Sequence, residues 1–229
     1  MYLLHYAPDN ASLIVRLALE ELGAPYQTRL VDRAAREQEG AAYRALNPAG
    51  LIPVLETADG PIFETGAILL WLSERHGALA PAPLDPARGA FLKWLFFTAN
   101  TLHADLRQLF YPERYAPPGC EAGFHAIAGR RIARHFGLLD VVAAEAPDWL
   151  SPEAPSVLSC YLAGLMRWAA LYPRGGTGWF RLDDTPALKT LAEAAEARPA
   201  ARRCAEAEGL GPTPFSAPGY AEPPEGSAT

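Results

Sequence analysis

The first eighty residues alternate between strand and helix patterns, whereas the rest of the chain has helix patterns only. Apolar runs at 3–6 and 26–31 have the length of buried strands. A helix pattern over 12–22, ended by Gly23, lies between them. The chain is therefore predicted to begin with a β-α-β unit.

A hairpin and a helix complete this unit. The apolar run 51–56 contains Pro53, which removes one ladder donor, and a tight turn at 58–60 leads into a partner strand. A helix pattern follows and ends at Gly77. The order β-α-β, then β-β-α, predicts a compact α/β domain over residues 1–78.

Proline-rich stretches bound the helical part of the chain. The first indicates a linker at 79–88 and precedes a domain, 89–211, that is predicted to be all-α. Its helix patterns cover 89–109, 124–146, 155–171 and 187–207, the last split by a proline. The second stretch predicts an extended or mobile tail at 212–229 rather than a packed element.

Composition excludes several classes of protein. A formal net charge of −6 disfavours binding to nucleic acid or to anionic membranes. No run approaches the roughly 18 to 20 apolar residues that span a bilayer, and the N-terminus lacks the basic start of a signal peptide. The three cysteines are widely spaced and form no C-x-x-C pair, so we expect neither a disulfide scaffold nor a zinc site. This use of cysteine also indicates a reducing compartment.

Two motifs in the first domain carry a family resemblance. Residues 47–55 read Asn-Pro-Ala-Gly-Leu-Ile-Pro-Val-Leu, and residues 64–68 read Glu-Thr-Gly-Ala-Ile after an Asp-Gly turn. Together with the loop 6–12, they resemble the cytosolic glutathione transferases, bacterial members in particular. The resemblance covers about residues 1–210 and implies a thioredoxin-like α/β domain followed by an all-α domain. It also implies a cytoplasmic homodimer that uses glutathione as co-substrate and needs no metal.

The resemblance assigns binding roles to four residues. It implies that Pro53 is cis and that the main chain of Ile52 is exposed as a strand edge, to which the glutathione backbone adds antiparallel. It places Glu64 against the γ-glutamyl ammonium and Thr65 against the γ-glutamyl carboxylate, at a helix start that carries positive partial charge. The alternatives are that Pro53 merely ends a strand and that Thr65 is an ordinary N-cap.

Activation of the glutathione thiol is predicted to involve the loop before the first helix. A thiol with a pKa of about 8.5 is only slightly ionised at pH 7, so a hydroxyl donor or helix amides must stabilise the thiolate. Ser12 is the preferred donor and Tyr6 the second candidate, whereas Asn10 suits a turn that contacts glutathione. Each has a structural alternative: an N-cap for Ser12, a packed strand end for Tyr6, and a purely structural turn for Asn10.

Two departures from bacterial relatives bear on the chemistry. Ala11 stands where several of them have a cysteine, and the first domain has none, so mixed-disulfide chemistry is not expected. His103 resembles a histidine that faces glutathione in the beta class, but Ala104 replaces the lysine that follows it there. The alternative for His103 is a structural helix residue.

A further departure concerns the segment 156–159, where the family has a capping box closed by an aspartate. Ser159 stands in its place, and we expect it to bond only weakly or Glu153 to compensate.

The function predicted from these observations is glutathione transfer to small hydrophobic electrophiles. An aromatic-rich helical domain would supply the pocket for the electrophile. Two alternatives remain open: a glutathione-dependent isomerase, dehalogenase or peroxidase that regenerates the thiol, and a noncatalytic glutathione- or ligand-binding member of the fold. One fold hosts many activities, so the fold alone does not separate them.

Overall fold

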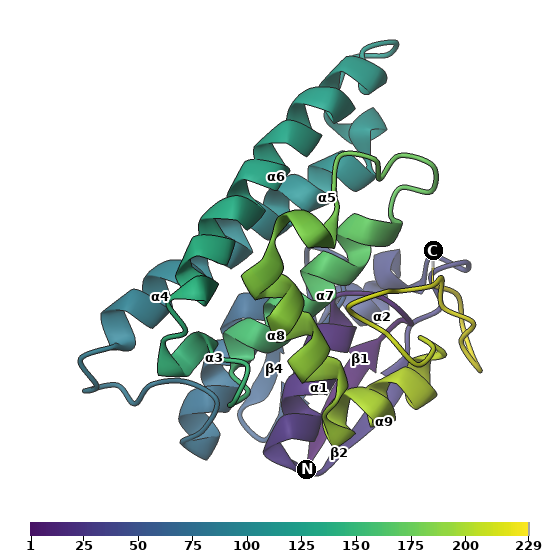
Figure 1. Ribbon diagram of the computed structural model, residues 1–229. Coiled ribbons are helices and arrows are strands. Elements are labelled where there is room, and N and C mark those ends of the chain that lie inside the picture. The colour runs from purple at the N-terminus through teal and green to yellow at the C-terminus, as the bar shows by residue number, and fades with distance from the viewer. Residues whose placement is uncertain (229) are drawn as a thin grey trace.

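A computed structural model of the chain describes residues 1–228, which form an α/β domain and a helical domain (Figure 1). The α/β domain holds one four-stranded sheet in the order β2-β1-β3-β4. β1 (Tyr2–Tyr6) runs parallel to β2 (Tyr26–Leu30) and antiparallel to β3 (Val54–Thr57), and β4 (Gly60–Phe63) pairs antiparallel with β3. The predicted α/β start is therefore confirmed.

The helix α1 (Ser12–Leu22) joins the two domains. Its residues from Ser12 to Leu19 are all buried, because α1 packs against α3 (Thr65–His76) on one side and against α7 and α9 of the helical domain on the other. Gly23 ends the helix in the left-handed conformation, with φ of 61°. The loop at the N-terminal end of α1 is thereby held against both domains.

The helical domain is built around α7 (Val157–Leu171), in which only Ala170 is not buried. Its other α-helices are α4 (Arg88–Phe97), α5 (Ala104–Phe110), α6 (Glu121–Ala144), α8 (Pro186–Glu196) and α9 (Pro199–Glu208). A short α2 (Ala41–Arg44) belongs to the α/β domain. Short 3-10 turns occur at Glu37–Glu39, Pro112–Arg114, Asp148–Leu150 and Leu182–Asp184. The all-α second domain is confirmed.

The predicted helix 89–109 contains an irregularity that the sequence pattern did not indicate. A π-helical turn, Thr98–His103, joins α4 to α5. Single π turns of this kind rotate the following side chains around the helix axis, and they occur frequently at functional sites. Here the turn ends at His103.

The start of α7 corrects our expectation about Ser159. Its hydroxyl accepts a hydrogen bond from the Ser156 amide at 2.8 Å, while the Ser159 amide donates to the Ser156 hydroxyl at 3.0 Å. The capping box is therefore complete without an aspartate and without Glu153, because the Ser159 hydroxyl lies within hydrogen-bonding distance of the Ser156 amide.

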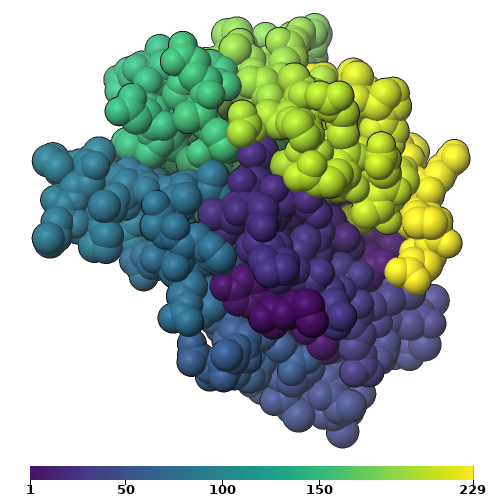
Figure 2. Space-filling model, turned by 90° about the horizontal axis from the view of Figure 1, so that it is seen from below, coloured from purple at the N-terminus to yellow at the C-terminus, as the bar shows by residue number. Residues whose placement is uncertain are grey.

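The proline-rich tail, residues 212–228, also differs from its prediction; Thr229 lies outside the described residues. It has no regular structure, but it is packed against the surface beside α9 (Figures 1 and 2). Phe215 is only 1% exposed and belongs to the core of the helical domain. The carbonyls of Pro214 and Gly219 accept hydrogen bonds from Arg167 on α7, at 3.1 and 3.0 Å. Buried polar partners, which a sequence pattern does not reveal, fix this tail in place.

The tail should contribute measurably to stability. Phe215→Ala removes a fully buried ring and should lower the free energy of unfolding by about 3 kcal/mol, measured by urea denaturation. Leu84→Ala is the control, because Leu84 is 98% exposed and its loss should change little. An unchanged midpoint for Phe215→Ala would mean that the tail is not packed in solution.

Candidate functional site

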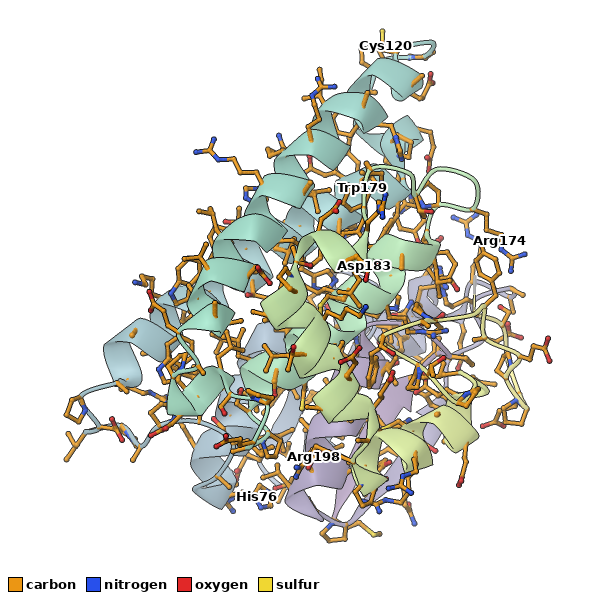
Figure 3. All side chains as sticks on the ribbon, in the orientation of Figure 1. His76, Cys120, Arg174, Trp179, Asp183 and Arg198 are labelled. Carbon is orange, nitrogen blue, oxygen red and sulfur yellow. The ribbon has the colours of Figure 1, made fainter. Side chains whose placement is uncertain are left out.

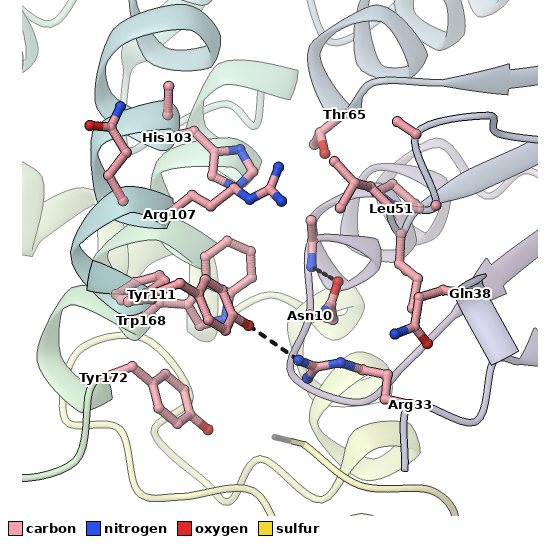
Figure 4. Close-up of a pocket in the computed structure, with 18 of the residues that line it drawn as sticks. Asn10, Arg33, Gln38, Leu51, Thr65, His103, Arg107, Tyr111, Trp168 and Tyr172 are labelled. Atoms are coloured by element: carbon pink, nitrogen blue, oxygen red, sulfur yellow. Dashed lines mark hydrogen bonds between the residues drawn. The ribbon is translucent and has the colours of Figure 1, made fainter. Parts of the chain in front are cut away.

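A cavity of about 1000 Å³ lies between the two domains (Figure 4). The α/β domain lines it with the loop 9–11, with side chains between 33 and 53, and with residues 64 and 65. The helical domain contributes residues from the π turn through residue 115, from α7, and from the loop that follows α7. This volume is at the upper end of the range for small-molecule sites, so there is room for a large ligand or for two smaller ones.

The segment 47–53 forms one wall of the cavity. The Asn47 side-chain amide donates to the Leu51 carbonyl at 2.7 Å, and the Tyr43 hydroxyl donates to the same oxygen at 3.0 Å. The Ile52–Pro53 peptide bond is cis, as the family resemblance implied, and both residues line the cavity. The reading of Pro53 as a simple strand end is therefore wrong, because β3 begins only after it, at Val54.

The N-terminus of α3 forms the next part of the wall. Glu64 precedes the helix with φ of 70°, and its side chain makes no capping hydrogen bond. The first intrahelical bond at this end runs from the Ile68 amide to the Glu64 carbonyl, at 3.0 Å. Within residues 1–228 the helix start therefore has no side-chain cap, and its first amides can bind an anion. Thr65, which is buried, lines the cavity at this point, as does Glu64.

The loop before α1 is held by a buried ion pair. The Asp9 carboxylate accepts two hydrogen bonds from the Arg167 guanidinium, at 2.7 and 2.8 Å, and both side chains are 0% exposed. Trp168 and Tyr172 donate to the same carboxylate at 2.9 and 2.8 Å. The Asp9 amide donates to Glu208 on α9, at 2.8 Å. These contacts fix Asp9 at φ of 50° and hold the next two residues, Asn10 and Ala11, at the cavity surface.

Ser12 and Tyr6 point away from the cavity. The Ser12 hydroxyl is fully buried, where it donates to the Ala7 carbonyl at 3.0 Å and accepts from the Ala7 amide at 3.3 Å. The Tyr6 hydroxyl donates to Glu225 of the tail. Burial and the Glu225 carboxylate raise the pKa of Tyr6. Neither residue is among those that line the cavity. Tyr6 is a packed strand end, whereas Ser12 is not an N-cap, because Ala11 is the N-cap of α1 and the Ser12 hydroxyl bonds back to Ala7.

Asn10 has a side-chain donor that can reach a ligand. Its Oδ1 accepts from the Ala11 amide at 2.8 Å, which assigns oxygen and nitrogen in the side chain. The amide nitrogen, Nδ2, has no hydrogen-bond partner in residues 1–228. Because Asn10 lines the cavity, the loop offers this donor in place of the Ser12 hydroxyl.

His103 approaches from the helical domain, at the end of the π turn (Figure 4). Its Nδ1 is 2.8 Å from the Tyr161 hydroxyl. Burial, aided by the nearby Arg107 guanidinium, lowers the pKa of His103 to about 4, so the ring is neutral at pH 7. The Tyr161 hydroxyl can either donate to Nδ1 or accept from it, and the ring proton lies on Nε2 in the tautomer in which the hydroxyl donates.

The structure thus brings together Ile52, Pro53, Glu64, Thr65, Asn10 and His103 in one cavity and leaves out Ser12 and Tyr6. Sequence analysis missed Asp9 and Arg107. Arg107 follows His103 by one helical turn, a spacing that places both on one face. Nothing in the sequence distinguished Asp9 from an ordinary loop residue, because its partner Arg167 is 158 positions away.

Comparisons with known proteins agree with this geometry. Residues 11–75 match the family of the glutathione S-transferase N-terminal domain. A solved sphingomonad glutathione S-transferase, complexed with glutathione, is 30% identical with a TM-score of 0.75, covering 91% of this chain and 100% of that one. An uncharacterised GST-like protein of Escherichia coli K12, YncG, is 28% identical over 82% of this chain and 88% of its own length. A maleylpyruvate isomerase of a Ralstonia species is 26% identical over 71% and 79%.

The fold and the two-domain cavity define a protein with a thioredoxin-like domain and a helical companion domain. The chain belongs to the glutathione S-transferase family. Within residues 1–228, every helix is too short or too polar to cross a bilayer. The same residues hold no cluster of three His, Cys, Asp or Glu side chains that would bind a metal ion.

The ion pair behind the loop should control stability. Asp9→Asn keeps a side chain that tolerates positive φ, but it leaves the Arg167 charge buried without its partner. The free energy of unfolding should fall by about 3 to 5 kcal/mol, measured by urea denaturation. Asp183→Asn, which breaks only the exposed pair with Lys189, should change little. Equal effects of the two substitutions would contradict this role for Asp9.

Proposed function

We propose that this protein binds glutathione in the interdomain cavity and activates its thiol for attack on an electrophile. The main support is that four features face one cavity: the uncapped N-terminus of α3, Glu64 beside it, the Ile52–Pro53 loop and the neutral ring of His103. The sphingomonad relative, which is complexed with glutathione, supports the proposal.

The γ-glutamyl end and the cysteinyl main chain of glutathione each have a complementary partner in this proposal. The γ-glutamyl carboxylate binds Thr65 and the first amides of α3, where the helix dipole stabilises an anion. The γ-glutamyl ammonium pairs with Glu64. The cysteinyl main chain pairs with that of Ile52, as in β-strand addition. Glutathione then lies along the wall formed by the α/β domain, with its sulfur between the loop 9–11 and His103.

We propose His103 and Asn10 as the groups that stabilise the thiolate. In the tautomer in which Tyr161 donates to Nδ1, His103 offers an Nε2–H, and the Nδ2 amide of Asn10 has no hydrogen-bond partner in residues 1–228. Hydrogen bonds to a charged acceptor are the strong ones. The neutral ring of His103 keeps its Nε2 proton available as a donor. In the transfer itself, the thiolate forms a bond to carbon, and the leaving group departs with its bonding electron pair.

A reaction that regenerates the thiol is the second candidate. The Ralstonia relative is a maleylpyruvate isomerase, and a Pseudomonas aeruginosa relative, 37% identical over 39% of this chain, is a maleylacetoacetate isomerase. In such a reaction the thiolate adds to a carbon–carbon double bond and then leaves. The same activated thiol serves both the transfer and the isomerisation.

A noncatalytic role remains the third candidate. The homodimer and the cytoplasmic location stay predictions.

Glutathione binding is tested by Glu64→Gln. Loss of the carboxylate that faces the ammonium should weaken binding at least about tenfold, measured by calorimetry. Glu193→Gln changes the charge equally at an exposed site of α8, outside the cavity, and should bind like the parent protein. Equal affinity of the two variants would exclude the role of Glu64.

Thiol activation is tested by the thiolate absorbance of bound glutathione against pH. His103→Phe should raise the pKa of the thiol by about one unit, because one charge-assisted hydrogen bond is lost. His103→Gln restores a donor and should recover most of the shift. Because burial lowers the pKa of His103 to about 4, its ring stays neutral over the range in which the thiol ionises.

Ser12→Ala and Tyr6→Phe serve as comparisons in the same titration. Both hydroxyls point away from the cavity, so neither substitution should move the pKa of the thiol. A raised pKa in Ser12→Ala with none in His103→Phe would return the role to Ser12.

A further inference from the structure

The cavity is rich in positive charge, although the chain has a formal net charge of −6. Three acidic residues line it, Asp9, Glu39 and Glu64. Six arginines line it: Arg33, Arg36, Arg44, Arg107, Arg114 and Arg174. The lining is therefore positive by three charges (six minus three), and His103 is neutral at pH 7.

Some of these arginines are occupied by the protein itself. Arg36 pairs with Glu39, at 2.9 and 2.5 Å. Arg33 donates to the Ala228 carbonyl of the tail at 2.9 Å and to the Tyr111 hydroxyl at 3.2 Å (Figure 4). Both belong to the α/β domain, as does Arg44. That side of the cavity is where the proposed function places glutathione.

The other three arginines belong to the helical domain. Arg107 on α5 makes no side-chain hydrogen bond or ion pair within residues 1–228, and its guanidinium extends into the cavity below His103 (Figure 4). Arg114 lies over the Tyr111 ring at 4.9 Å and makes a long, exposed ion pair with Glu113 at 3.8 Å, whereas Arg174 lies over the Tyr220 ring at 4.0 Å. Figure 3 shows Arg174 beside the C-terminal tail. Stacking on a ring leaves the N–H groups at the guanidinium edge free.

We infer that the electrophile bound in this cavity is anionic and that its carboxylate pairs with Arg107. Arg114 and Arg174, in the same wall of the cavity, add positive charge around that carboxylate. This inference rests on the proposed function, which assigns the α/β wall to glutathione. A guanidinium binds a carboxylate through two parallel hydrogen bonds, so Arg107 would orient the substrate as well as attract it. Phe110 and Trp168, which also line the cavity, would hold the apolar body of that electrophile.

Arg107 also has a role in the bond-forming step. A thiolate and a carboxylate repel each other, and a cation placed beside both offsets that repulsion. When the thiolate adds to an unsaturated carboxylate, a C–S bond forms and the π-electron pair moves toward the conjugated carbonyl. A proton from water completes the addition, and no oxidant or reductant is needed. Elimination of the thiolate reverses these steps and regenerates glutathione.

The inference is tested by binding, without turnover. The protein is saturated with S-methylglutathione, and two probes of similar shape, para-nitrobenzoate and para-nitrobenzamide, are titrated by calorimetry. The carboxylate should bind at least about tenfold more tightly than the amide. Arg107→Gln should remove most of that preference, whereas Arg107→Lys should retain part of it. Arg134→Gln, an equal charge change on the exposed face of α6, should retain all of it.

The outcomes separate the inference from the proposed function. Tight binding of S-methylglutathione with equal affinity for the two probes would overturn the anionic electrophile and leave the proposed function standing. A preference for the carboxylate that survives Arg107→Gln undiminished would overturn the role of Arg107. A parent protein that does not bind S-methylglutathione would overturn the proposed function and this inference with it.

Discussion

The structure depends on the buried pairing of Asp9 with Arg167. Two charges that are fully removed from water are tolerated only when their remaining hydrogen-bonding groups are satisfied. Here Trp168 and Tyr172 complete the carboxylate, and two tail carbonyls complete the guanidinium. One ion pair therefore ties the loop before α1, the central helix of the other domain and the C-terminal tail into a single arrangement.

This arrangement explains how a cavity between two domains is held in a defined shape. Its α/β wall consists of the backbone at the start of α3 and of the loop before β3. In that loop the Leu51 carbonyl accepts hydrogen bonds from the side chains of Tyr43 and Asn47. Its opposite wall is positioned by a π turn, which brings His103 to the cavity, where Tyr161 orients the ring. Rigid elements thus carry the polar groups, and a site held in this way loses little free energy to reorganisation on binding.

The electrostatics of the cavity are opposite to those of the whole chain. Arginines from both domains line the cavity together with a neutral histidine, and two of the lining acids are paired within the protein. Net charge describes long-range attraction and solubility, whereas a ligand bound in a cavity interacts at short range with the charges that line it. An acidic protein can therefore present a cationic site, which composition alone would exclude.

The sequence by itself determined the elements of the fold and the wall that resembles the family, because these depend on local patterns. The helix 12–22 with Gly23, the hairpin and the cis Pro53 are confirmed. Glu64 and Thr65 line the cavity, and their binding roles stay predictions. The tertiary structure decided the direction of Ser12, the packing of the tail and the pairing of Asp9. It also decided that Arg107 faces the cavity. Such contacts join residues up to 219 positions apart, and a side chain's direction follows from packing that no local pattern encodes.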